Sequence, residues 1–273
     1  TVLSLDPLDH PDLTPLFVAS PQLLDLHGID AAAATAPFYS DEPGEVVALV
    51  GDNGAGKSTL IKAMDGVQPA DSGEMYFEGR QVRVTDPQAA ARLGITTVLQ
   101  DLALCDNLDV VANLFLGQEE VGGDGIPVPV HALDETDMEQ RTLQLLDDLS
   151  VTTLGSVRTP VGNLSGGQRQ SVAIARSLVG DPKVVLFDEP TAALGVSQTD
   201  QVLALENRLA ERGLGVVVIS HNLANVFAVA DRIVVLLLGK RVATFETEKT
   251  TREEVVAAIT GASADTAERE GQV

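Results

Sequence analysis

Residues 51–59 read Gly51-Asp52-Asn53-Gly54-Ala55-Gly56-Lys57-Ser58-Thr59, and this segment is the most informative one for the fold. It fits the phosphate-loop pattern G-x-x-x-x-G-K-[ST], with an apolar run at 46–50 before it and a helical pattern at 60–64 after it. The glycines let consecutive backbone N–H groups converge on an anion at the positive end of that helix. We therefore predict that all nine residues bind the phosphates of a nucleotide. The alternative, a glycine-rich turn with an incidental lysine, is disfavoured because both flanks match.

A metal and base site is predicted from the loop and from an acid pair later in the chain. Lys57 offers a cation to the outer phosphates, and the Ser58 hydroxyl can hold Mg²⁺. Asp188 and Glu189 follow the apolar run at 184–187, the mark of a parallel strand buried on both faces, which ends at the ligand-binding edge of such a sheet. Asp188 is predicted to hold Mg²⁺ and Glu189 to orient or deprotonate the attacking water. The alternative is a solvated pair of acids at a strand end.

A second anion-binding loop is predicted at Ser165-Gly166-Gly167-Gln168. It precedes a helix whose apolar residues recur with a period near 3.6, so its backbone N–H groups lie at a helix N-terminus. No lysine or acid pair completes this loop. We expect it to close over phosphates bound by a second copy of the chain, in a two-fold dimer with two nucleotides at the interface. A simple glycine-capped helix start is the alternative.

Together these motifs resemble the ATP-binding cassette of an ABC transporter, in the family's order, from about residue 23 to 261. The resemblance implies that ATP and Mg²⁺ are bound. It places Gln100, after residues 95–99, at the position that contacts Mg²⁺ and the attacking water and senses the transmembrane partner. It places His221, after the strand at 216–219, at the switch position that contacts the terminal phosphate. Without the resemblance, a lone histidine after a strand reads as an ordinary surface or core residue.

Within that family, residues 100–108, 113–117 and 191–196 resemble the cassettes of bacterial ribose- and xylose-type sugar importers. The resemblance implies transmembrane permease subunits as partners, a sugar-binding protein as an indirect one, and a position at the inner face of the cell membrane. Such importers often fuse two cassettes, so one cassette here implies a homodimer. Two other classes stay open: an ABC-type ATPase that works without a permease in repair, ribosome or cluster assembly, and a nucleotide sensor without useful turnover.

The expected fold class is α/β, a P-loop NTPase core of the RecA-like kind with a small antiparallel β subdomain and an inserted α-helical subdomain. Residues 74–77 and 81–84 read as a hairpin, and 138–149 and 252–259 as helices. The helical subdomain is expected at about 101–162, an extended lead-in at 1–22, a single domain at 23–261 and a polar tail at 262–273. Two interpretations of the adenine contact stay open: Phe38 or Tyr39 stacks on the ring, or an exposed loop holds the adenine loosely. Residues 31–34 are assigned no role.

Composition narrows the partners and the compartment. The 273 residues contain 40 acids and 18 bases, a net charge of −22 that disfavours nucleic acid and anionic lipid. The longest apolar run, 233–238, is far shorter than the ~20 residues that a membrane-spanning helix needs. The single cysteine, Cys105, can form no internal disulfide, and no signal segment opens the sequence. We therefore expect a cytoplasmic protein.

Overall fold

A six-stranded, mostly parallel sheet organises the chain. The computed structural model describes residues 44–70, 75–78, 80–122, 132–192 and 194–262. The strand order is β10-β9-β1-β8-β7-β4, and each neighbouring pair is parallel except the antiparallel edge pair β9 and β10. The strands are β1 (Val46–Gly51), β4 (Ile95–Val98), β7 (Val184–Asp188), β8 (Gly215–Ile219), β9 (Arg232–Leu237) and β10 (Lys240–Glu246).

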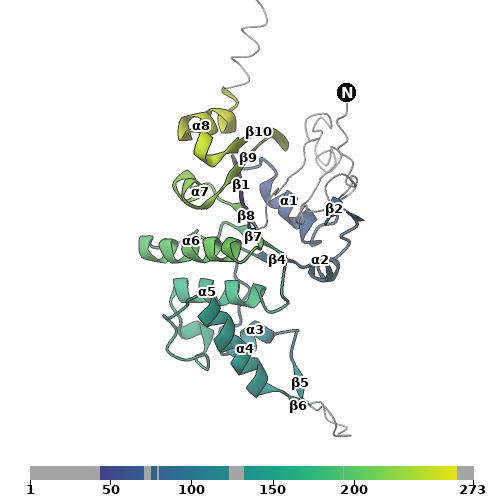
Figure 1. Cartoon of the computed structure of the whole chain (residues 1–273), viewed down its shortest axis with the longest axis vertical. Coiled ribbons are helices and arrows are strands. Elements are labelled where there is room, and N and C mark those ends of the chain that lie inside the picture. The colour runs from purple at the N-terminus through teal and green to yellow at the C-terminus, as the bar shows by residue number, and fades with distance from the viewer. Residues whose placement is uncertain (1–43, 71–74, 79, 123–131, 193, 263–273) are drawn as a thin grey trace, which may run out of the picture.

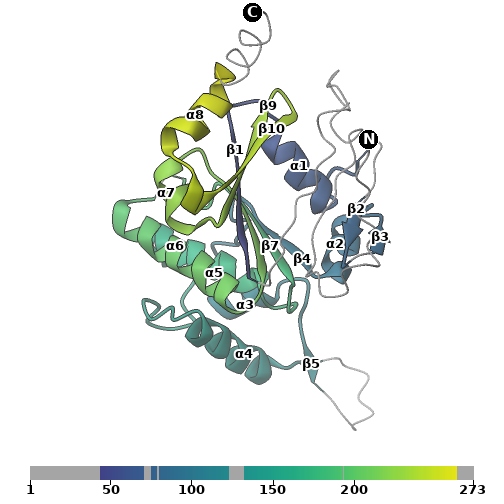
Figure 2. The ribbon, with the colours of Figure 1, turned by 45° about the horizontal axis from the view of Figure 1, so that its top comes forward.

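Helices cover both faces of this sheet, which explains why its inner strands are continuously apolar. Alternate residues of β1 enter two separate cores: Val46, Ala48 and Val50 pack on one face, and Val47 and Leu49 on the other. The first face carries α5 (Gly166–Ser177), α6 (Val196–Glu211), α7 (Leu223–Val229) and α8 (Arg252–Thr260). The second carries α1 (Lys57–Met64) and α2 (Pro87–Leu93). Figures 1 and 2 show the two groups of helices on opposite sides of the sheet.

A small hairpin packs on the same face as α1. It consists of β2 (Met75–Phe77) and β3 (Arg80–Val82), paired antiparallel, with Met75 and Phe77 buried in that core. The hairpin predicted from the sequence is confirmed, with shorter strands. Arg80 pairs with Phe77 and belongs to β3, whereas the sequence placed it in the turn.

The chain between β4 and β7 forms a mainly helical insertion. It contains α3 (Val110–Phe115), the short antiparallel strands β5 (Val121–Gly122) and β6 (Ala132–Leu133), α4 (Glu135–Asp148) and the 3₁₀ turn η4 (Val161–Asn163) before α5 begins. The helix predicted at 138–149 begins three residues earlier, because Asp134 caps it by accepting a hydrogen bond from the Asp137 N–H. The β5–β6 pair was not predicted. Residues 123–131, between these two strands, lie outside the described residues.

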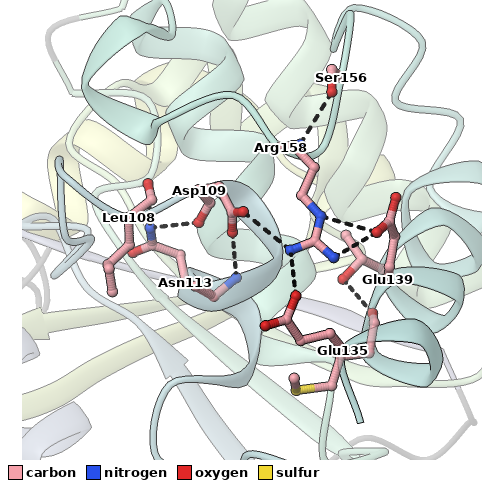
Figure 3. A network of polar contacts seen from close by, with 10 residues as sticks. Leu108, Asp109, Asn113, Glu135, Glu139, Ser156 and Arg158 are labelled. Carbon is pink, nitrogen blue, oxygen red and sulfur yellow. Dashed lines mark hydrogen bonds and ion pairs between the residues drawn. The ribbon is translucent and has the colours of Figure 1, made fainter. Parts of the chain in front are cut away.

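Polar contacts hold α3 and α4 to the segment after α4 (Figure 3). The Arg158 guanidinium lies 3.4 Å from Asp109 at the start of α3, and 3.5 Å and 2.6 Å from Glu135 and Glu139 of α4. Asn113 is fully buried, and its amide nitrogen donates to the carbonyl oxygens of three residues while its oxygen accepts from the Cys105 N–H. The three acceptors are Cys105, Leu108 and Asp109. The insertion thus has one buried and one exposed polar cluster.

The last described element is the predicted C-terminal helix. α8 matches the prediction for 252–259 and starts at a capping box between Thr251 and Glu254. The expectations for 1–22, for residues 31–34 and for Phe38 and Tyr39 lie outside the described residues, as does the tail from 263 onward. No helix in the described ranges combines the length and apolar character needed to cross a bilayer.

Candidate functional site

The nine-residue loop lies between β1 and α1, as the sequence predicted. Gly51 has φ +153°, and a Cβ there would lie 2.2 Å from the Leu236 carbonyl oxygen, so a side chain is excluded at this close approach of β9. Gly56 caps α1 in the left-handed conformation, with φ 97°. Asp52, Asn53 and Gly54 are exposed at the top of the loop. The loop therefore presents its backbone at the N-terminus of α1, the arrangement that suits an anion.

Lys57 braces the loop from within. Its ammonium nitrogen donates to the carbonyl oxygens of Gly51, at 2.9 Å, and Asp52, at 3.0 Å. These two hydrogen bonds hold the Lys57 ammonium group against the first residues of the loop. A phosphate group in the loop would therefore meet a positive charge that is already in place.

The carboxyl end of β7 lies beside the start of α1. The Ser58 hydroxyl is 3.5 Å from Oδ1 of Asp188, a pair of oxygen donors brought together across 130 positions of sequence. Burial raises the pKa of Asp188, the neighbouring Glu189 charge raises it further, and the Ser58 hydrogen bond and the charges of Lys62 and Lys57 act in the opposite direction. A cation bound beside Asp188 would favour its ionised form.

The next acid has a different partner. Oε2 of Glu189 lies 2.8 Å from Nδ1 of His221, which follows β8; the Glu189 side chain is 16% exposed and that of His221 71%. Strands β7 and β8 are neighbours and parallel, with Asp188 opposite Ile219, so both residues leave the sheet at the same edge. The structure thus brings together the residues that the sequence proposed as base and switch.

Gln100 lies farther along this edge. It follows β4 by two residues, and Val98 of β4 pairs with Phe187 of β7, directly before Asp188. The Gln100 side chain is exposed and, within the part of the chain that the structure describes, makes no hydrogen bond to Ser58 or Asp188. Its role as a metal and water ligand stays a prediction.

The second loop begins α5 as predicted. Ser165 is the N-cap: its hydroxyl accepts from the Gln168 N–H at 3.3 Å, and the Gln168 side chain accepts from the Ser165 N–H at 2.9 Å. Ser165 and Gly166 are exposed, while Gly167 is buried against Gln198 of α6. The capping box satisfies two of the backbone donors and leaves the exposed end of the helix facing outward.

The helices that follow the two phosphate-type loops pack on opposite faces of one sheet. Helix α1, which the first loop opens, packs in the core with Val47 and Leu49, whereas α5 packs in the core with Val46, Ala48 and Val50. Figure 2 shows the sheet between these helices. The use of the second loop by a nucleotide on another subunit stays a prediction.

The polar residues that lie behind the Glu189–His221 pair were not predicted from the sequence. Asn225 of α7 donates from Nδ2 to the Thr191 hydroxyl at 3.0 Å, which ties the chain after Glu189 to the helix after His221. Glu206 of α6 is fully buried close to this bond, in the same small cavity. The sequence does carry a signal for the burial of Glu206. This residue has the spacing of a buried helical stripe and is the charged member among Val202, Leu205 and Leu209.

The fold and the site together define a phosphate-loop nucleotide hydrolase with an inserted helical region. Residues 39–192 match the family model described as ABC transporter. The chain belongs to this family: it is an ATP-binding subunit of an ABC transporter and an ABC-type ATPase.

Two relatives and one solved structure show the similarity. The chain is 44% identical over 221 residues to the fructose import ATP-binding protein FrcA of Rhizobium meliloti, covering 81% of this chain and 85% of the relative. It is 44% identical over 217 residues to the xylose/arabinose import ATP-binding protein XylG of Sulfolobus acidocaldarius, covering 80% and 83%. The ADP conformation of an ATP-binding cassette of an ABC transporter superposes with a TM-score of 0.67 at 25% identity, covering 83% of this chain and 87% of that one.

Proposed function

We propose that this chain hydrolyses Mg-ATP to drive the import of a carbohydrate through transmembrane permease subunits. The observation that carries the catalytic part is the 2.8 Å contact between Glu189 and His221 beside the Ser58–Asp188 pair. The carbohydrate part rests on the two relatives, whose names state fructose and xylose/arabinose import. A sugar-binding protein would deliver the solute to the permease, and the subunit would work at the inner face of the membrane.

The residues present fit a magnesium ion. Ser58 and Asp188 offer hard oxygen donors 3.5 Å apart, which are the ligands that Mg²⁺ prefers. No group of three or more His, Cys, Asp or Glu side chains suited to a metal occurs in the described ranges. The remaining ligands would therefore come from the nucleotide phosphates, water and Gln100. Bound there, the ion would neutralise charge on the transferred phosphoryl group.

The chain's own residues then have distinct tasks. Residues 51–59 cradle the phosphates with backbone N–H groups, and Lys57 adds a positive charge. Glu189 accepts a proton from the water whose oxygen attacks the terminal phosphorus, while the bond from that phosphorus to ADP breaks. His221 holds Glu189 in place through Nδ1, which leaves Nε2 for the terminal phosphate.

A second copy of the chain would complete each site. The loop Ser165-Gly166-Gly167-Gln168 would contact the phosphates bound by the other subunit. It begins a helix whose N-terminal end is exposed, and no lysine or acid pair completes it as a nucleotide site of its own. Two such contacts form at once in a two-fold dimer. The exposed Ser165 and Gly166 are the groups available for this contact.

Hydrolysis is tested with the purified full chain and two variants. Glu189→Gln should keep ATP binding and lower the hydrolysis rate by roughly 10² to 10⁴, since the amide keeps the shape and loses the basicity. Lys57→Ala should weaken nucleotide binding itself. A Glu189→Gln rate within about twofold of the parent would remove Glu189 from this mechanism.

Carbohydrate import is tested in the organism that carries the chain. Deleting the gene that encodes the chain should abolish uptake of at least one labelled monosaccharide from a panel of pentoses and hexoses. The parent allele should restore that uptake and the Glu189→Gln allele should not. Unchanged uptake of every sugar in the panel would contradict the carbohydrate assignment and leave the hydrolysis result standing.

A further inference from the structure

A small cavity lies beside the two segments that carry Glu189 and His221. Its volume is about 10 Å³, close to the lower limit for one water molecule. Pro190 and Thr191, which follow Glu189, line one side, and Ser220, which precedes His221, lines another. The cavity is therefore lined by the direct sequence neighbours of the catalytic pair.

Glu206 lines the same cavity from α6 and is the unusual group in it. Its side chain is fully buried, and neither carboxyl oxygen has a hydrogen-bond partner among the described residues. Burial raises the pKa of Glu206 to about 8. At neutral pH the carboxyl group is therefore protonated, with one O–H to donate and a carbonyl oxygen to accept.

Apart from Glu206, the described residues that line the cavity are uncharged. The cavity walls from β1, β8 and α7 contribute Ala48, Val218, Val226 and Val229, none of which titrates. The other charged side chains of α5 and α6 have partners or solvent away from the cavity. Arg208 donates to the Leu149 carbonyl oxygen, and Arg176 donates to the Ala103 carbonyl oxygen. Arg169 pairs with Asp106, and Asp200 and Glu211 are exposed. Glu189, across the Pro190–Thr191 segment, is bonded to His221.

The polar side chains of the cavity already link the two catalytic segments and retain further bonding capacity. The Ser220 hydroxyl accepts from the Asn222 N–H at 3.1 Å, and the Thr191 hydroxyl accepts from Asn225 at 3.0 Å. Both hydroxyl groups still carry a proton to donate. A water molecule at this point would find the two to four polar partners that buried water requires.

We propose that the cavity binds one water molecule shared by Glu206, Ser220 and the Thr191–Asn225 pair, and that Glu206 thereby acts as a positioning residue for Glu189 and His221. This inference rests on the proposed hydrolytic function. The proposed positioning role explains why a carboxyl group lies in a helical stripe whose other members are Val202, Leu205 and Leu209. An apolar side chain there would avoid the penalty of burying a polar group, so the carboxyl is expected to have a use.

The test compares a polar and an apolar replacement in the purified full chain. Glu206→Gln keeps the shape and the hydrogen bonds, so kcat at pH 7 should stay within about threefold of the parent. Glu206→Leu fills the same space without hydrogen bonds, and kcat should fall about tenfold or more while the KM for ATP stays unchanged. Glu211→Gln, on the exposed end of the same helix, is the matched control and should behave as the parent.

Three further readouts separate positioning from a structural role. The melting temperature of Glu206→Leu should equal or exceed that of the parent, because an apolar group now occupies an apolar stripe; if it falls, Glu206→Met, whose flexible side chain adapts to the space, replaces it. Above about pH 8 the kcat of the parent should fall relative to that of Glu206→Gln, since ionised Glu206 no longer donates a proton. A crystal structure of the parent should show an ordered water between Glu206 and Ser220.

Several results overturn the proposal without touching the proposed function. The proposal fails if Glu206→Leu keeps the kcat of the parent, or if Glu206→Gln and Glu206→Leu lose kcat equally. It also fails if only the KM for ATP changes, or if the crystal structure shows no water in the cavity. A parent chain that hydrolyses no ATP, or that hydrolyses it equally well as Glu189→Gln, contradicts the proposed function itself.

Discussion

At the scale of single residues, two consecutive acids have different surroundings because the backbone turns between them. Asp188 ends β7 and faces Ser58. Glu189 has a φ of 53°, a left-handed conformation that costs about 1–3 kcal/mol in a residue with a side chain. Its N–H donates to the Ile219 carbonyl oxygen at 3.0 Å, which holds this turn against β8. The turn aims one carboxylate at the proposed metal site and the other at His221.

Glu206 should make the stability of the protein depend on pH. The folded protein keeps a proton on Glu206 up to about pH 8, whereas the unfolded chain releases it near the ordinary value of 4.5. In that window the unfolded chain binds fewer protons, so the contribution of this residue to stability falls as pH rises, by up to about 1.4 kcal/mol per pH unit. Below the window both states are protonated and the penalty is absent.

Denaturant unfolding of the parent and Glu206→Gln at several pH values from 5 to 9 measures this effect. The free energy of unfolding of the variant relative to the parent should rise steadily with pH and level off above about pH 8. The comparison cancels every other titrating group that the two proteins share. A difference that is constant over the whole range would contradict a neutral Glu206.

At the scale of elements, the start of α5 distinguishes two adjacent glycines. A Cβ on Gly167 would lie 3.0 Å from Cγ of Gln198, whereas a Cβ on Gly166 would meet, among the described residues, only Leu194, at 3.5 Å. Gly166→Asp should therefore fold normally, because it has room and its charge is favourable at a helix N-terminus. It should also prevent nucleotide-driven dimer formation, since the carboxylate would face the phosphates of the other subunit.

Melting temperature, ATP binding and dimer formation are measured for Gly166→Asp, with Gly167→Asp for comparison. The first variant should match the parent in melting temperature and in ATP binding by the monomer, and fail to dimerise. The second should lose stability by about 1–3 kcal/mol because Gln198 must move. If Gly166→Asp lost ATP affinity in the monomer as severely as Lys57→Ala, the loop would serve its own subunit and the dimer inference would be wrong.

The insertion offers a second contrast, between its buried and exposed polar clusters (Figure 3). Asn113→Ala removes a fully buried amide and leaves the Cys105 N–H and several carbonyl oxygens without that partner, which should cost about 2–4 kcal/mol. Arg158→Ala breaks ion pairs of a side chain that is 40% exposed, which should cost about 1 kcal/mol or less. Denaturant unfolding monitors both variants, and a larger loss for Arg158→Ala would contradict this ranking.

At the scale of the whole molecule, charge and topology together predict a conditional dimer. A subunit with a net charge of −22 repels its twin, and the helices that follow the two phosphate-type loops pack on opposite faces of one sheet. The chain should be monomeric without nucleotide and dimeric with Mg-ATP when Glu189→Gln prevents hydrolysis. Raising the salt concentration should strengthen the dimer, because ions screen the repulsion. Removing Mg²⁺ with a chelator should return the monomer.

Light scattering at protein concentrations above and below micromolar measures the mass in each condition. The wild-type chain with ADP is the control for nucleotide binding without the terminal phosphate and should remain monomeric. An identical mass with and without Mg-ATP at every concentration would contradict the sandwich dimer for the free subunit.

The sequence alone determined the features that depend on neighbouring residues. The loop at 51–59, the buried strand before Asp188, the helix after residues 165–168 and the helix at 252–259 were predictable, because glycine placement and apolar period act within a few positions. The capping box at Ser165 was not predicted. The family followed from the order of these signals along the chain. Their proposed roles in ATP hydrolysis stay predictions.

How these pieces meet depends on the tertiary structure. That Glu189 contacts His221, that Asp188 faces Ser58, and that α1 and α5 lie on opposite faces of the sheet all depend on strand order and on a backbone turn at one residue. The burial of Glu206 depends likewise on α6 and α7 closing over β1 and β8. Sequence patterns fix which side of a helix or strand is apolar, but packing between distant segments selects the neighbours that each side receives, and those neighbours set the chemistry.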